Sequence, residues 1–282
     1  MKASPCYGPD AMITGLHHVA VAVRDFEAGV DGYRRLLGRE PEIRDGEGAR
    51  RAWFGLPNMA FEVIAPVAPG AATDRVNAHL DAHGEGIWLA AFHVDDMPAA
   101  LRLIERRGLA PNPTRPSAAL IDVAGITMAL TSEEPWAVAQ VIGDAAAAVS
   151  ELDHVVVSTP NADRALANYG AKFGLDLRLD RENAQWGARQ LFFRCGSAVF
   201  EIGASLKADR DPQGPDRFGG LAWRVTDPDA VHARLAAAGF NVSELRTGRK
   251  PGTKVFTVRD APHGATLGGV PTIFIQQNAE PA

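Results

Sequence analysis

One pattern occurs four times along the chain, and it limits the fold more than any other feature of the sequence. In its clearest copy, His154 precedes the β-branched run 155–157, which predicts a short strand. Asn161 then offers a helix N-cap, and the helix that follows is expected to end at Gly174. A strand followed by a helix therefore opens each copy.

The same order appears near the start of the chain. His18 precedes the apolar segment 19–23, and a predicted helix over 26–37 ends at Gly38. Both copies then reach a strand in which phenylalanine is followed by glutamate. These pairs are Phe61 with Glu62 and Phe200 with Glu201.

Two further copies are more diverged but keep a strand, a helix and extended segments in the same order. The second copy has its helix over 97–107, and the fourth has its helix over 229–238. Each of these helices stops at a glycine, as the other two do. Every copy is therefore predicted to be a βαβββ module.

A βαβββ module has one apolar sheet face and a single helix, so it buries a core only by pairing with another module. The sequence therefore predicts an α+β fold in which four modules pair into two domains. Pairing of one with two and three with four, or of one with four and two with three, both remain open. The expected organisation is an N-terminal arm (1–12), a first domain (13–133, with modules 13–66 and 84–133), an Ala-rich linker (134–150) and a second domain (151–277, with modules 151–204 and 216–277).

Composition narrows the classes of partner. A net charge of -5, from 29 Lys+Arg against 34 Asp+Glu, provides no basic field for nucleic acid and no polybasic membrane anchor. No apolar run approaches the roughly 20 residues that cross a bilayer. The two cysteines, Cys6 and Cys195, do not form a disulfide framework, so a reducing cytoplasm is the expected location. A small molecule is the expected partner.

A histidine ahead of a strand, a helix that ends in glycine and a later strand that carries glutamate together resemble the vicinal oxygen chelate superfamily. That group contains glyoxalase I, methylmalonyl-CoA epimerase, extradiol dioxygenases and the bleomycin-resistance proteins. The resemblance covers about residues 14–277 and implies glyoxalase-like domains with cup-shaped mixed sheets. It also leads us to expect a homodimer. The fold hosts unrelated chemistries, so it does not by itself identify the reaction.

In metal-using members, the resemblance implies, each of two paired modules gives one ligand from its first strand and one from its last. The matching positions here are His18, Glu62, His154 and Glu201. Nitrogen and carboxylate ligands suit a divalent metal such as Zn, Ni, Fe or Mn. We therefore expect a divalent metal as the cofactor.

The diverged copies depart from this pattern. Leu89 and Gly220 stand where histidine is expected, and Ala129 and Phe274 stand where glutamate is expected. Under either pairing each cup then holds one histidine and one glutamate, and the complete set of four requires modules one and three together. The alternative to a ligand role is that each histidine is a strand-end residue whose hydrogen bonds are satisfied within the protein. That alternative suits the glutamates less, because an inward carboxylate is costly unless it is bound or hydrogen-bonded.

Basic side chains supply candidates for binding a substrate. Arg224 and His93 occupy the same place in their strands, and the arginine that glyoxalase I carries there implies that Arg224 clamps an anion. The alternative role for Arg224 is an ion pair with a nearby carboxylate. His93 is expected either to carry a proton or to be a buried histidine of the core. Arg189 is expected to line a cup, and Lys250 lies in a basic loop that is expected to receive an anion unless it is a solvated turn.

These residues lead to one main function and two alternatives. The main function is a glyoxalase-like lyase or isomerase, in which His154 and Glu201 hold the metal, Glu201 also moves a proton, and the substrate is small, oxygenated and anionic. One alternative is a metal-free protein that sequesters a small molecule, as resistance proteins do. An extradiol dioxygenase ranks last, because two histidines and one glutamate do not occur together in one cup.

Overall fold

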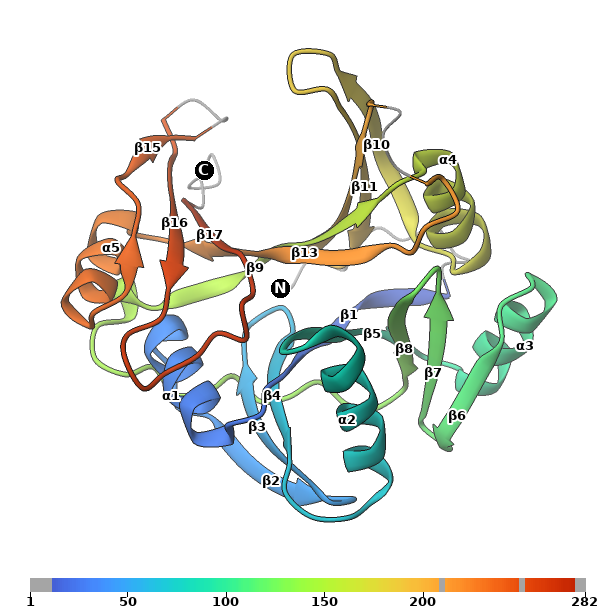
Figure 1. Ribbon diagram of the computed structural model, residues 1–282, viewed down its shortest axis with the longest axis horizontal. Helices are drawn as coiled ribbons and strands as arrows, with labels where there is room; N and C mark the ends of the chain where they lie inside the picture. Colours follow the sequence, from blue (N-terminus) through green and yellow to red (C-terminus); the bar gives the residue numbers. More distant parts are fainter. Residues whose placement is uncertain (1–11, 208–210, 249–251, 277–282) are drawn as a thin grey trace, which may run out of the picture. The chain divides into compact units, whose positions relative to one another are not determined.

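The computed structural model describes residues 12–207, 211–248 and 252–276, and its elements follow the predicted order of four modules (Figure 1). Module one contains β1 (Ile13–Ala22), α1 (Phe26–Leu37), β2 (Glu42–Gly46), β3 (Ala49–Gly55) and β4 (Ala60–Pro66). Helix α2 (Ala71–His83) follows it. Module two contains β5 (Gly86–Val94), α3 (Met97–Arg106), β6 (Pro111–Arg115), β7 (Ala118–Val123) and β8 (Ile126–Thr131).

The second half repeats this order after a short 3-10 turn, Ala145–Ala147. Module three contains β9 (Val149–Thr159), α4 (Ala162–Ala165) with its π-helical continuation Leu166–Lys172, β10 (Asp176–Asn183), β11 (Ala188–Cys195) and β12 (Ala198–Ser205). Module four contains β13 (Arg217–Val225), α5 (Pro228–Ala237), β14 (Asn241–Val242), β15 (Arg246–Thr247), β16 (Lys254–Asp260) and β17 (Thr272–Gln276). The predicted α+β fold is confirmed.

The strands form two mixed sheets. Their orders are β2-β3-β4-β1-β5-β8-β7-β6 and β10-β11-β12-β9-β13-β17-β16-β14. Strand β12 runs parallel to β9, whereas the β10–β11 and β11–β12 pairs are antiparallel. Within the described ranges, no helix is both long and apolar enough to span a membrane.

The helix ends follow the predicted local chemistry. The Asp25 side chain accepts a hydrogen bond from the backbone of Ala28 at the start of α1, and Asn161 does the same for Arg164 at the start of α4. Gly38, at the end of α1, has φ 66°, a left-handed conformation that glycine adopts without a Cβ penalty. These caps fix where each helix leaves its strand.

The chain also divides into two compact units that cut across the sequence order. The first unit comprises Met1–His18, Leu89–Pro135 and His154–Gly219. The second comprises Val19–Trp88, Trp136–Asp153 and Gly220–Ala282. The first unit therefore combines most of modules two and three, and the second combines most of modules one and four.

Aromatic side chains form the core of the first unit. The buried ring of Phe92, from β5, lies 5.2 Å from the ring of Phe173 and 5.7 Å from that of Phe200. Tyr169 packs on Phe200 at 5.6 Å and donates a 2.7 Å hydrogen bond to the buried carboxylate of Asp216. One residue of module two thus packs against the end of the helix and the last strand of module three.

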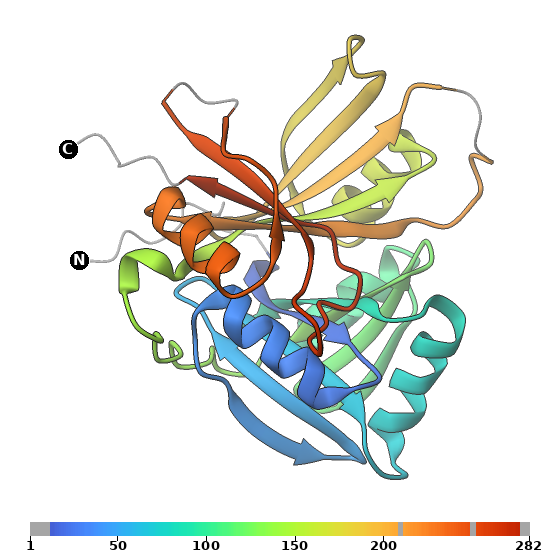
Figure 2. The same cartoon turned by 60° about the vertical axis from the view of Figure 1, so that its left-hand side comes forward.

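The second unit is built in the same way from modules one and four. The buried ring of Phe61, from β4, lies 4.3 Å from Tyr33 of α1 and 5.5 Å from Trp223 of β13. Arg234 of α5 donates hydrogen bonds to the carbonyls of Arg35 and Leu36 at the end of α1. Figure 2 shows the orange helix α5 next to the blue helix α1. Cores are therefore shared between modules one and four, and between modules two and three.

Gly32 provides a test of this packing. Alanine normally stabilises a helix relative to glycine, but a Cβ at position 32 would collide with the backbone carbonyl of Thr266. We expect Gly32→Ala to lower the free energy of unfolding by about 1–3 kcal/mol, because backbone cannot move aside as a side chain can. Denaturant unfolding measures the change. Asp31→Ala on the same helix is the control and should cost about 0.5 kcal/mol or less; an equal or greater stability of Gly32→Ala would contradict the packing.

Candidate functional site

His154 and Glu201 lie on the same face of neighbouring strands in the first unit. Along β9, residues 155, 157 and 159 are buried, whereas His154, Val156 and Ser158 are partly exposed on the other face. In the parallel β9–β12 pair, Glu201 lies opposite Val156 and Val199 lies opposite His154. Glu201 is therefore a diagonal neighbour of His154, as the period-2 alternation predicts.

The two side chains approach each other. His154 Nε2 lies 3.5 Å from Glu201 Oε2, and the side chains are 17% and 14% exposed. The other oxygen, Oε1, accepts a 2.6 Å hydrogen bond from Gln190 Nε2. Both oxygens of this largely buried carboxylate thus have partners, which offsets the cost of removing it from water.

The contacts of Glu201 continue through Gln190 to Arg181. Gln190 Oε1 accepts hydrogen bonds from Arg181 Nη2 at 3.0 Å and Nε at 3.3 Å. One orientation of the amide satisfies both neighbours, because its oxygen must face the cation and its nitrogen the carboxylate. Neither Gln190 nor Arg181 was predicted from the sequence, although Gln190 occupies the cup-facing alternation of β11.

Aromatic rings flank the arginine. The Arg181 guanidinium carbon lies 5.2 Å from the centre of the Phe192 ring and 6.0 Å from that of Trp186. Phe192 pairs with Glu201 across β11 and β12, and Arg181 pairs with Gln190 across β10 and β11. These side chains define the module-three cluster: His154, Glu201, Gln190, Arg181, Phe192 and Trp186.

The histidine and carboxylate of this cluster suit a divalent ion. Two ligands held at about 2.1 Å from one ion in tetrahedral geometry lie about 3.4 Å apart, close to the 3.5 Å between His154 Nε2 and Glu201 Oε2. In the parts of the chain that the structure describes, no group of three or more His, Cys, Asp or Glu could hold a metal. An ion at this pair therefore depends on oxygens from substrate or water.

The equivalent position in module one has different surroundings. Glu62 is 3% exposed, and its Oε1 lies 3.1 Å from Arg51 Nε. Trp53, which pairs with Glu62 across the strands, stacks at 4.4 Å on Trp136 from the segment that follows module two. Arg44 lies 4.2 Å above the same Trp136 ring. In module one an arginine neutralises the carboxylate, and Trp136 covers the aromatic neighbour.

The first-strand histidines of the N-terminal half belong to a separate histidine cluster in the first unit. His18 Nδ1 lies 2.8 Å from His17 Nδ1, and the His17 ring stacks on that of His93 at 6.3 Å. Thr14 Oγ1 lies 2.6 Å from His93 Nδ1. Burial lowers the pKa of His17, so a neutral ring is favoured there. His17 was not among the predicted site residues.

Two of the other predicted substrate-binding groups, Arg224 and Arg189, lie outside the module-three cluster. Arg224 donates 2.7 Å hydrogen bonds to both Asp153 and Glu151, the ion pairing named as its alternative role. Arg189 lies on the opposite sheet face from Gln190, where hydrogen bonds to Asp180 and Asp163 raise its pKa. Lys250 lies outside the described residues.

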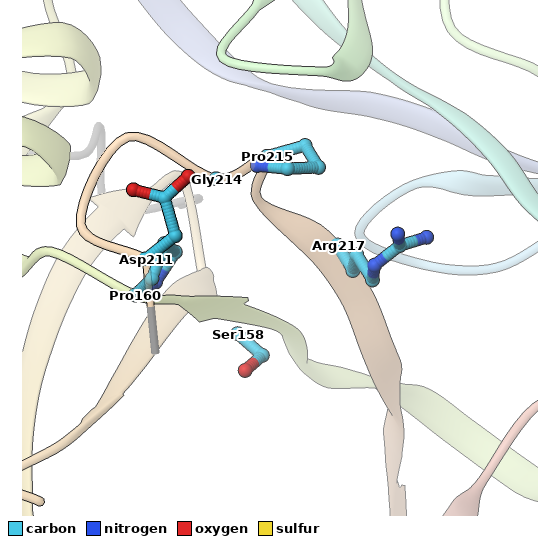
Figure 3. Close-up of a pocket in the computed structure, with 6 residues that line it drawn as sticks. All are labelled: Ser158, Pro160, Asp211, Gly214, Pro215 and Arg217. Atoms are coloured by element: carbon cyan, nitrogen blue, oxygen red, sulfur yellow. The ribbon is translucent and has the colours of Figure 1, made fainter. Parts of the chain in front are cut away.

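A cavity of about 420 Å³ opens at the end of β9 in the first unit. Figure 3 shows the residues that line it, with the carboxylate of Asp211 and the guanidinium of Arg217 directed away from each other. Its lining is Ser158, Pro160, Asp211, Gly214, Pro215 and Arg217. Ser158 shares the partly exposed face of β9 with His154, so the cavity continues the face that carries the cluster.

Comparison with known protein families decides the relationship. The model of the glyoxalase/bleomycin resistance protein/dioxygenase superfamily matches residues 17–124, and a second model of that superfamily matches residues 151–267. The chain belongs to this superfamily. The resemblance predicted from the four repeats is therefore confirmed.

Individual relatives within the superfamily have several chemistries. An ethylmalonyl-CoA/methylmalonyl-CoA epimerase from Cereibacter sphaeroides is 32% identical over 101 residues, which cover 34% of this chain and 73% of the epimerase. A mutant 4-hydroxymandelate synthase from Streptomyces coelicolor has a TM-score of 0.71 at 16% identity, covering 96% of this chain and 94% of that one. The Mn(II)-bound glyoxalase from Novosphingobium aromaticivorans has a TM-score of 0.65 at 15% identity, covering 94% and 82%. The likeness to the two solved structures shows the shared superfamily fold alone.

The cover over module one can be tested by removing Trp136. We expect Trp136→Ala to lower the free energy of unfolding by about 1–3 kcal/mol, because the stack with Trp53 and the Arg44 contact are both lost. Tryptophan fluorescence emission should also shift to longer wavelength, because the Trp53 ring becomes exposed to solvent. Trp186→Ala is the matched control: Trp186 is 51% exposed, so its removal should cost about 0.5 kcal/mol or less. Equal costs for the two variants would contradict the covering role.

Proposed function

We propose that this member of the superfamily is a metal-dependent enzyme of the glyoxalase type, which moves a proton on a carbon next to a carbonyl group of a small oxygenated acid. The observation that carries the proposal is the approach of His154 Nε2 to within 3.5 Å of Glu201 Oε2 on a partly exposed sheet face. Module one holds its equivalent carboxylate against Arg51. The reaction is therefore assigned to module three.

Each residue of the pair has a role in this chemistry. His154 and Glu201 would hold the divalent ion, which would supply Lewis-acid polarisation of adjacent substrate oxygens. Glu201 also accepts the proton, because it is the carboxylate of the cluster. Gln190 donates to Glu201 Oε1 and fixes the direction of the other oxygen. With Oε1 held by Gln190, Oε2 is the oxygen that would accept the proton.

The epimerase relative supports this class of reaction. Epimerisation of a methylmalonyl thioester removes and returns a proton on the carbon between a thioester and a carboxylate, which is the chemistry proposed here. The aligned segment covers 34% of this chain. The relative therefore supplies a first substrate to assay.

A metal-free binding protein is the second candidate. The described residues contain no group of three metal-binding side chains. Leu179 and Trp186, 44% and 51% exposed on the β10–β11 hairpin, give the cluster an apolar edge that suits capture of an organic molecule. Metal binding separates the two candidates.

We expect the purified protein to bind about one divalent ion per chain after loading with Mn, Zn, Ni or Fe, measured by elemental analysis. His154→Ala and Glu201→Gln should each weaken binding by about tenfold or more, because each removes a direct ligand. Glu182→Gln, an exposed carboxylate on β10, is the matched control and should keep the metal. Unfolding midpoints of the metal-free variants show whether each one folds.

Two results would contradict this assignment. Wild-type protein that binds none of the four metals, with an unshifted melting temperature, would favour the metal-free candidate. Loss of metal in Glu62→Gln as complete as in Glu201→Gln would move the site away from module three alone.

Proton transfer can be followed without knowing the final product. Methylmalonyl-CoA and the hemithioacetal of methylglyoxal with glutathione both carry a proton on a carbon next to a carbonyl group. In D2O, we expect the metal-loaded protein to exchange that proton for deuterium in one of them, as seen by proton NMR. Glu201→Gln should slow the exchange by about 100-fold or more, because it removes the base. Exchange at the wild-type rate in this variant would exclude Glu201 as the base.

A further inference from the structure

The module-three cluster contains a cation without an acidic partner. Arg224 and Arg189 each have two carboxylates, and Arg51 has Glu62. Within the described part of the chain, the hydrogen-bonding partner of Arg181 is instead the neutral carbonyl oxygen of Gln190. Among the described residues Arg181 therefore forms no ion pair, and it is linked to Glu201 through Gln190.

The position of Arg181 is fixed by its neighbours. Nε and Nη2 are held on one oxygen of Gln190, and the guanidinium lies between the rings of Phe192 and Trp186. The Nη1 edge is left for another acceptor. A guanidinium held in this way has little rotational freedom to lose when it binds a planar anion, so binding is favoured.

We propose that Arg181 is the anion clamp of this protein and that it binds a carboxylate of the substrate. A guanidinium presents two parallel N–H groups that match a carboxylate. A phosphate would call for further cations, whereas Arg181 is flanked by aromatic rings that suit an apolar carbon chain. The proposal rests on the proposed function only in placing the clamp beside the reacting group.

Gln190 couples the clamp to the reacting carboxylate. Its oxygen accepts from Arg181, and its nitrogen donates to Glu201 Oε1 at 2.6 Å. A carboxylate bound at Arg181 therefore lies one side chain away from Glu201. The substrate class is an acid whose carboxylate and reacting carbon are separated by no more than the width of one amide side chain, as in a malonyl or 2-oxo acid group.

The test uses metal-free wild-type protein and isothermal titration calorimetry, so it does not depend on metal or turnover. The probes are malonate, benzoate, neutral malonamide and inorganic phosphate, at ionic strength matched with sodium chloride. We expect malonate or benzoate to bind in the millimolar range and malonamide not to bind. Arg181→Gln should weaken binding by about tenfold or more, and Arg181→Lys by less, because lysine keeps the charge but loses the fork.

Arg178→Gln is the matched control, because Arg178 lies on the same strand and pairs with Asp176 at 2.6 Å. Its affinity for malonate should remain within about twofold of wild type. Circular dichroism and the unfolding midpoint show whether Arg181→Gln keeps its fold. If it does not, the affinity of Arg181→Lys for malonate is compared with that of wild type instead.

Several results would overturn the clamp. These are equal affinity in wild type and in a folded Arg181 variant, binding of malonamide as tightly as malonate, tighter binding of phosphate than of either carboxylate, and no binding of either carboxylate at tens of millimolar. Carboxylate binding that needs Arg181, in a protein that binds none of the four metals when they are added, would leave the clamp standing and remove the proposed reaction. Metal binding without carboxylate binding would do the reverse.

Discussion

The packing of aromatic rings between non-consecutive modules is the constraint on which the rest of the structure depends. A single βαβββ module leaves one sheet face uncovered, and the rings of Phe92 and Phe61 fill that need by contacting another module. Phe92 contacts Phe173, which directly follows the helix of module three, and Phe200, which lies in its last strand. Because Phe200 and Glu201 are adjacent in β12, burying the ring on one face directs the carboxylate to the other.

Duplication has produced two carboxylates with opposite environments. Glu62 lies against Arg51, and its strand partner Trp53 is covered by Trp136. Glu201 instead lies between His154 and the side-chain amide of Gln190. The same amide accepts a hydrogen bond from Arg181, which has no acidic partner in the described chain. The same strand position therefore has an arginine partner in one module, and a histidine and an amide in the other.

The architecture was largely predictable because it depends on local patterns. His154 with the following β-branched residues, the Asn161 cap and Gly174 fix a strand, a helix and its end within one stretch of chain. Side-chain partners were less predictable. Arg224 and Arg181 are both strand arginines, and the difference between them lies in Glu151 and Asp153, which a different strand supplies. Gln190 has no ionisable group to attract notice, yet it links the two charges of the cluster.

The segment that joins the two halves has a second consequence. Trp136 belongs by sequence to the connector, but its ring packs on Trp53 of module one. The backbone N–H of Ala139, also in the connector, donates a hydrogen bond to the carbonyl of Gly55. Dividing the gene directly after module two, before residue 134, would place this ring in the carboxyl-terminal fragment, away from the module that it covers. The amino-terminal fragment would then expose the aromatic surface that Trp136 covers, and this exposed apolar surface would favour self-association of the fragment.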